Sequence, residues 1–213
     1  MEALERIAIN TNWIPMVLVF LFSLIAVLKV IDAEKLRGYF LALFNRGFIE
    51  DEVEEDTSFF NSFYGVLFVF SSTVLALTIS LFAAEKSTRF PLNFSSFLSI
   101  LGIVFGYLIV KNLLEVVITR LFFINKQLRF FVISKLSYLY SISFFLLIFY
   151  IVFLFSPLNT SSYIYIASVL FLLRFVFHAR NNKNLIFSEL FYFILYICAL
   201  EIAPLLTLFK LML

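Results

Sequence analysis

The sequence predicts an all-α fold: a polytopic membrane helix bundle of about six transmembrane helices, with one short amphipathic helix at the membrane interface. Hydrophobic residues make up 63% of the 213 residues, the mean hydropathy is +1.05, and only 14% of the residues are charged. A soluble domain carries about a quarter charged residues, so this chain is too apolar to be one. The apolar residues also lie in runs of about 20 or more, the length that a helix needs to cross a bilayer. We expect residues 1–213 to form a single transmembrane domain.

The first expected span is residues 13–31, which open with a tryptophan at the expected interface. The residues before it are not basic and no small-residue cleavage site follows, so we expect a retained helix rather than a signal peptide. Asp32 can cap a shorter helix over residues 33–46, which we expect to lie in the membrane interface because it is too short to span. A solvated connector is the alternative. The apolar stripe of this helix consists of Leu36, Tyr39, Phe40, Leu43 and Phe44.

The only dense run of charge, EDEVEED, covers residues 50–56. Such a run is typical of a solvated loop, which is how we interpret it. The functional alternative is a docking site for a basic partner or a divalent cation. The glycine-punctuated spacing of calcium loops is missing, so the sequence does not support the cation. The acidic residues of the run are Glu50, Asp51, Glu52, Glu54, Glu55 and Asp56.

Five further apolar runs are long enough to span. Pro91 and Asn93 mark a turn between the second and third spans, and a break near Asn125 separates the third from the fourth. At about 45 Å, from a rise of 1.5 Å per residue, the third and fourth spans exceed the hydrocarbon thickness, so their shared end should protrude or tilt. The five runs are residues 59–84, 94–124, 126–155, 161–179 and 184–213.

Lysine and arginine are unevenly shared between the two sides of the expected bundle. The side that holds the loops after the first, third and fifth spans carries ten of them, against four on the opposite side. By the positive-inside rule the first side is cytoplasmic, which places both termini in the periplasm. The ten are Lys29, Lys35, Arg37, Arg46, Arg120, Lys126, Arg129, Lys135, Arg180 and Lys183, and the four are Arg6, Lys86, Arg89 and Lys210.

Six charged or titratable residues inside the expected spans form a candidate polar site. Lys111 and Glu115 lie four residues apart on one helix and can pair there. If the last two spans form a hairpin that turns near residues 181–182, Arg174 and Glu189 both lie about 11 Å from the turn at 1.5 Å per residue. We therefore expect a cross-helix ion pair between them. The six residues are Lys111, Glu115, Arg174, His178, Glu189 and Glu201.

Glu201 has no obvious partner, and Pro204 breaks the helix three residues after it. By the helical rise, Glu201 is expected about 29 Å from the turn near residues 181–182. The intramembrane cation nearest that depth is Lys111, which is expected about 21 Å from Asn125 by the same rise. Glu115 has a second potential partner in Lys135 at its own depth. We interpret these charges as structural pairs that fix the helix orientations. The alternative is a polar cavity in which Glu201 and Lys111 relay protons or an anion.

The sequence gives no support for a cofactor or a metal. The single cysteine, Cys198, and the single histidine, His178, cannot form a Cys/His ligand set. We interpret Cys198 as a small packing residue and His178 as an interfacial hydrogen-bonding residue. The expected spans hold no Asp and only scattered Ser and Thr, so no catalytic residue is assigned.

The last run contains LYICALEIAPLLTLFK, residues 195–210. This Cys-x-x-Glu-Ile-x-Pro arrangement near the end of a six-span chain resembles an uncharacterised integral-membrane family of Bacteroidetes, the domain-of-unknown-function family 4271. The resemblance implies an inner-membrane protein of a double-membraned bacterium. Since the family has no assigned activity, it carries over no catalytic residues.

We therefore expect a multi-pass protein of the bacterial inner membrane that acts as a non-catalytic subunit or accessory factor of a cell-envelope complex. Its partners would be the lipid bilayer and a membrane or envelope protein. No nucleic acid is expected, because the net charge is only +2 and is spread between loops. The competing hypothesis is a small proton-coupled transporter that uses Glu201 and Lys111. An intramembrane enzyme acting on a lipid or isoprenoid substrate is the third hypothesis.

Overall fold

The computed structural model describes residues 12–54, 62–86, 91–121, 126–156 and 160–181. These residues form seven α-helices and no strand, which confirms the all-α fold class for the part of the chain that is described. The helices are α1 (Trp13–Ile31), α2 (Ala33–Leu41), α3 (Arg46–Glu54), α4 (Ser62–Lys86), α5 (Phe94–Leu121), α6 (Lys126–Phe155) and α7 (Thr160–Asn181).

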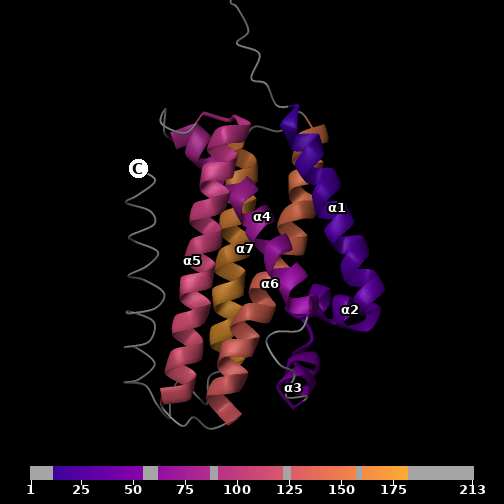
Figure 1. The fold of residues 1–213 in the computed structure, drawn as a ribbon, viewed down its shortest axis with the longest axis vertical. Helices are drawn as coiled ribbons and strands as arrows, with labels where there is room; N and C mark the ends of the chain where they lie inside the picture. The colour runs from indigo at the N-terminus through magenta and orange to yellow at the C-terminus, as the bar shows by residue number, and fades with distance from the viewer. Residues whose placement is uncertain (1–11, 55–61, 87–90, 122–125, 157–159, 182–213) are drawn as a thin grey trace, which may run out of the picture.

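The five long helices run along one axis in alternating directions, whereas α2 lies across the end of α1 and α3 lies beside α6 (Figure 1). The centre of the bundle is α4, which contacts α1, α5, α6 and α7. Its apolar stretch is 72% buried, against 28% for that of α1 and 22% for that of α5. Helices α1 and α5 are therefore outer helices, and many of their apolar side chains face away from the bundle.

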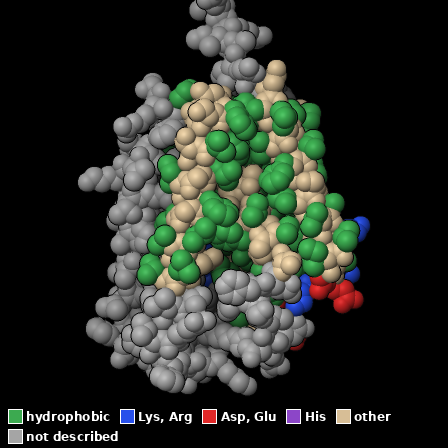
Figure 2. All heavy atoms as spheres, in the orientation of Figure 1, with side chains coloured by type: hydrophobic (Ala, Val, Ile, Leu, Met, Phe, Trp, Pro, Cys, Tyr) green, Lys and Arg blue, Asp and Glu red, His purple; other side chains and the backbone are tan. Residues whose placement is uncertain are grey.

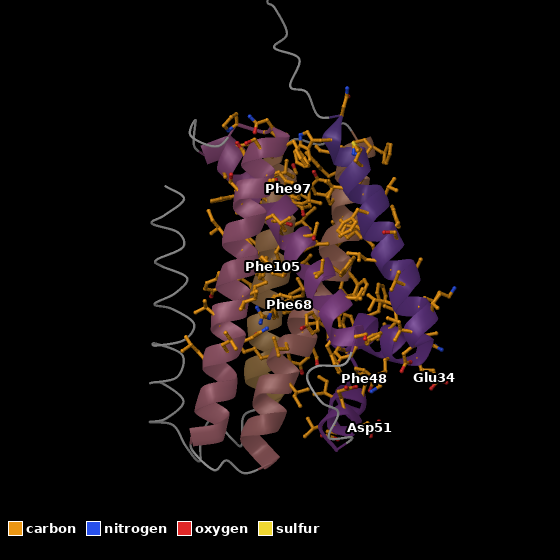
Figure 3. The ribbon with its side chains drawn as sticks, in the orientation of Figure 1. Glu34, Phe48, Asp51, Phe68, Phe97 and Phe105 are labelled. Carbon is orange, nitrogen blue, oxygen red and sulfur yellow. The ribbon has the colours of Figure 1, made fainter. Side chains whose placement is uncertain are left out.

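Aromatic side chains join the outer helices to the centre. The rings of Phe68 on α4 and Phe105 on α5 lie 5.3 Å apart, and Phe97 at the start of α5 stacks on Trp13 of α1 at 4.9 Å. Figure 3 shows these three phenylalanines along the line where α5 meets α4. Rings at such separations add to the energy of burial, so these contacts fix the positions of α1 and α5 against the core.

Among the described residues, four helices are long and apolar enough to cross a membrane: α1, Ser62–Glu85 of α4, Phe94–Leu114 of α5 and Ile133–Phe155 of α6. The apolar part of α7, Thr160–Arg174, is shorter. The expected count of six spans therefore remains a prediction, and residues 184–213 lie outside the described residues. Figure 2 shows hydrophobic side chains over the visible described face, with charged side chains at the end where α2 lies.

The expectation for residues 33–56 was wrong in two respects. The predicted helix over 33–46 ends at Leu41, and a turn over 42–44 follows. The acidic run predicted to be a loop is helical as far as Glu54, while residues 55 and 56 lie outside the described residues. The cause is a new helix start at Asn45, whose side-chain oxygen accepts the Phe48 N–H at 3.4 Å. The Asp32 cap, by contrast, forms as expected, accepting the Lys35 N–H at 2.8 Å.

Gly38 is what allows α2 and α3 to approach each other closely. The Phe48 ring of α3 packs against Gly38, and a Cβ built on Gly38 would collide with the ring. We expect Gly38→Ala to push α3 away from α2 and to destabilise the protein by about 1–3 kcal/mol, the usual effect of overpacking. The measurement is thermal unfolding in detergent micelles, with Gly102→Ala on α5 as control, because a Cβ there meets nothing within 4 Å. Equal effects of the two substitutions would contradict the prediction.

Candidate functional site

A buried cluster of aromatic and polar side chains lies where α2 and α3 pack against α4 and α6. Tyr39 of α2 is at its centre and is 2% exposed. Four aromatic rings surround the Tyr39 ring at centroid distances of 5.1–6.2 Å, and together they come from α3, α4 and α6. They belong to Phe48, Phe63, Tyr64 and Tyr140.

Glu52 of α3 points into this cluster and is only 5% exposed. The Tyr64 hydroxyl of α4 donates a hydrogen bond to Glu52 Oε1, and Lys35 Nζ of α2 lies 3.7 Å from the same oxygen. The Lys35 side chain is 19% exposed, so only the lysine end of this ion pair reaches the solvent. A buried carboxylate is tolerated when it is paired and hydrogen-bonded, and both conditions are met here. The cluster thereby ties three helices together.

The pKa of Tyr39 is raised well above its ordinary value of 10.0, first because burial disfavours the charged phenolate and second because the charge of Glu52 repels it. The phenol therefore stays protonated over the whole range in which proteins fold. Its hydroxyl lies close to the Glu52 carboxylate and to Ser137 of α6. Tyr39 thus links the carboxylate to a fourth helix.

Alkaline pH should weaken this part of the structure. A group whose pKa is raised by folding contributes its full stability below the unfolded value of 10.0 and loses it as the pH rises towards the folded value. We expect wild-type protein to lose more thermal stability between about pH 8 and about pH 11 than Tyr39→Phe, which has nothing to ionise at this position. Parallel losses in the two proteins would show that Tyr39 does not contribute to this pH dependence.

Helix α6 supplies the polar wall behind the cluster. The Ser141 hydroxyl donates to the backbone carbonyl of Phe40 at 2.9 Å, which fastens α2 directly to α6. Inside an apolar helix such small hydroxyls let neighbouring helices approach closely. Among the described side chains of α6, Ser134, Lys135, Ser137, Ser141 and Ser143 are polar and buried.

The predicted intramembrane site is described only in part. Lys111 lies with Nζ 5.8 Å from the ring centre of Tyr107, one turn earlier on α5. Arg174 of α7 donates to the backbone carbonyl of Lys135 on α6 at 3.2 Å, and Lys135 itself is 3% exposed. The structure thus brings Arg174 to the α6–α7 contact, at a residue that the depth arithmetic had paired with Glu115.

The side chains of the remaining predicted partners lie outside the described part of the structure. The side chains of Glu115 and His178 lie outside the described side chains, as do the whole of Glu189, Glu201 and Pro204. The pairs Lys111–Glu115, Arg174–Glu189 and Lys111–Glu201 therefore stay predictions.

Hydroxyl groups of α4 mostly donate hydrogen bonds to backbone carbonyls of the same helix. Ser72 and Thr73 donate to the carbonyls four residues earlier at 2.7 and 2.8 Å, and Thr78 shares a hydrogen bond of 2.9 Å with the Tyr163 hydroxyl of α7. Among the described residues, Ser71 Oγ and Trp13 Nε1 are buried without a hydrogen-bond partner. This pattern is typical of helix packing in membranes.

Sequence reasoning missed the Glu52 cluster because it treated the acidic run as one solvated segment. The signal that could have found it is the spacing of Ile49 and Val53, which lie four residues apart and flank Glu52 on one helical face. Ile49 is fully buried, whereas Glu50 and Asp51 on the opposite face are exposed. The run is therefore an amphipathic helix with one carboxylate turned inward.

The fold and these clusters define a membrane-embedded helical protein, in which polar side chains join the helices to one another. The chain belongs to the family described as a domain of unknown function, DUF4271, whose match covers residues 14–212. The family expected from residues 195–210 is thereby confirmed. No curated protein and no solved structure matches the chain.

Proposed function

We propose that this protein is a multi-pass component of the bacterial inner membrane and acts as a non-catalytic subunit or accessory factor of a cell-envelope complex. The observation that supports the proposal is the α2–α3 hairpin. It lies outside the candidate spans and is held against the bundle by the buried Glu52 cluster. A simple connector between two spans needs no such attachment, so the hairpin is better explained as a shaped surface that a partner contacts.

The surface that the hairpin presents is acidic. Glu34, Glu50 and Asp51 are exposed on α2 and α3, and Figure 3 shows Glu34 and Asp51 near the outer edges of the two helices. With Glu52 turned inward, the exposed carboxylates keep a fixed orientation on the helix. A partner with a basic segment on the same side of the membrane is electrostatically complementary to this surface.

Site-specific photocrosslinking in native membranes tests the proposal. With the photoreactive residue in place of Asp51 we expect one discrete protein adduct, whereas in place of Val30, which is 87% exposed on the outer helix α1, we expect lipid adducts. Glu52→Gln should weaken the Asp51 adduct because it loosens α3. A monomeric protein that gives no protein adduct from Asp51 would overturn the proposal.

A second candidate function is a proton-coupled transporter. It is favoured by the burial of Lys135, two residues inside the start of the apolar stretch Ile133–Phe155 of α6, with Arg174 bound to its carbonyl, because buried cations in membrane-spanning helices often mark ion pathways. This hypothesis places the carboxylate of Glu201 on the pathway. Glu201→Gln should then abolish flux in proteoliposomes while the protein still accumulates, and unchanged flux and growth would count against it.

A further inference from the structure

We propose that the outer face of α2, formed by Arg37, Leu41 and Phe44, binds an anionic phospholipid of the membrane, with the phosphate at Arg37 and an acyl chain along Phe44. Leu41 is 39% exposed, Phe44 is 70% exposed, and Arg37 is exposed as well. Their spacing of four and three residues places them along one side of α2 and of the turn that follows it. The opposite side carries Tyr39 and Lys35 and packs into the Glu52 cluster.

The depth of α2 fits this proposal. The 19 residues of α1 rise about 28 Å at 1.5 Å per residue, which is close to the hydrocarbon thickness of about 30 Å. Helix α2 begins two residues after α1 ends and lies across it (Figure 1). It therefore runs along the boundary between acyl chains and headgroups, where amphipathic helices bind.

Ring contacts place Phe44 on the hydrocarbon side of that boundary. Its ring lies 6.3 Å from Phe145 of α6 and 6.1 Å from Phe177 of α7. Phe145 belongs to the candidate span Ile133–Phe155. The Phe44 ring contacts a spanning helix and yet is 70% exposed, so it faces acyl chains and not the interior of the bundle.

Charge decides which lipid fits. Within the described part of the chain Arg37 makes no ion pair, and Lys29 at the end of α1 is a second exposed cation at this end of the bundle. Glu34 is exposed one turn before Arg37 and offsets its charge on that side. The positive charge of Arg37 therefore extends along the helix towards Leu41. A guanidinium binds a phosphate through paired hydrogen bonds, which makes Arg37 a suitable headgroup ligand.

Fluorescence quenching by brominated lipids tests the contact and its selectivity. The full chain with Phe44→Trp in a Trp13→Phe background is reconstituted in phosphatidylcholine vesicles that contain phosphatidylglycerol, with bromine on the acyl chains of one lipid at a time. We expect strong quenching, with anionic lipid enriched around Trp by up to about fivefold, the factor for one Arg at an anionic surface. Arg37→Gln should abolish the enrichment and keep the quenching, and Lys29→Gln should leave both unchanged.

Three outcomes would overturn the proposal. Quenching by aqueous iodide but not by brominated lipid would place Phe44 in water. Equal quenching by the two lipids would show acyl contact without a headgroup site. Enrichment lost equally in Arg37→Gln and Lys29→Gln would indicate a diffuse surface charge.

Native mass spectrometry of the otherwise unaltered chain gives an independent measurement, since Arg37→Gln should lower the number of retained anionic phospholipids relative to Lys29→Gln. None of these measurements depends on the proposed envelope partner.

Discussion

Replacing Lys35 with methionine should lower the free energy of unfolding by about 3 kcal/mol, the low end of the loss expected when one partner of a buried ion pair is removed. The Lys35 ammonium lies 3.7 Å from a carboxylate whose side chain is only 4% exposed, so the substitution leaves a buried charge without this cation. Methionine keeps the length and apolar stem of lysine. The effect therefore reports the charge and not the packing, and unfolding in mixed micelles measures it.

Two further variants sharpen this experiment. Arg37→Met removes an exposed cation from the same helix and should change stability by less than about 0.5 kcal/mol, as surface substitutions usually do. Lys35→Met combined with Glu52→Gln removes both charges and should recover part of the loss. If Lys35→Met proved as mild as Arg37→Met, the Glu52 cluster would not hold α2 and α3 in place.

Truncating Tyr39 to alanine should have a larger effect, about 3–5 kcal/mol, as large-to-small substitutions of buried aromatic residues do. Tyr39 is 2% exposed and touches aromatic rings from three other helices, so its removal opens a cavity at the point where those helices meet. The measurement is again the free energy of unfolding, together with hydrogen exchange over residues 33–54.

Tyr39→Phe separates the ring from its hydroxyl. This variant keeps the ring contacts and removes the hydroxyl that lies close to Glu52 and Ser137, so we expect a loss of about 1 kcal/mol, the usual value of one hydrogen bond. Exchange should rise over α2 and α3 in Tyr39→Ala and change little in α4. A uniform rise over α4 as well would mean that the hairpin and the bundle unfold together, contrary to the view of α2–α3 as an attached unit.

Most of the fold could be predicted from the sequence because long apolar runs leave few choices. Helices occupy residues 13–31 and 126–155 as expected, and α4, α5 and α7 occupy the other described runs with small shifts at their ends. In a bilayer every backbone polar group must be satisfied within its own segment, so an apolar run of this length folds as a helix whatever its neighbours are. The capping of α2 by Asp32 also depends only on residues close by in the sequence, and it was predicted correctly.

The candidate site was harder to predict because it depends on which helices are neighbours. Depth arithmetic assigned levels along each helix but not the face that each residue presents. Arg174 was expected to meet Glu189, which lies outside the described residues, and the structure shows it bound to the carbonyl of Lys135. Nothing in the local sequence around either residue specifies that α6 and α7 bring them together.

The sequence by itself determined that this is a helical membrane protein, where its long helices run and which family it belongs to, because hydropathy and helix length act locally along the chain. Only the tertiary structure decided which carboxylates of the acidic run are exposed and which one is buried. Glu50, Asp51 and Glu52 are all acidic, but the packing of Ile49 into the core and of the Phe48 ring against Gly38 turn Glu52 inward towards Lys35 and Tyr64. A buried carboxylate is stable only where partners from other helices converge on it, and that convergence is a property of the assembled bundle.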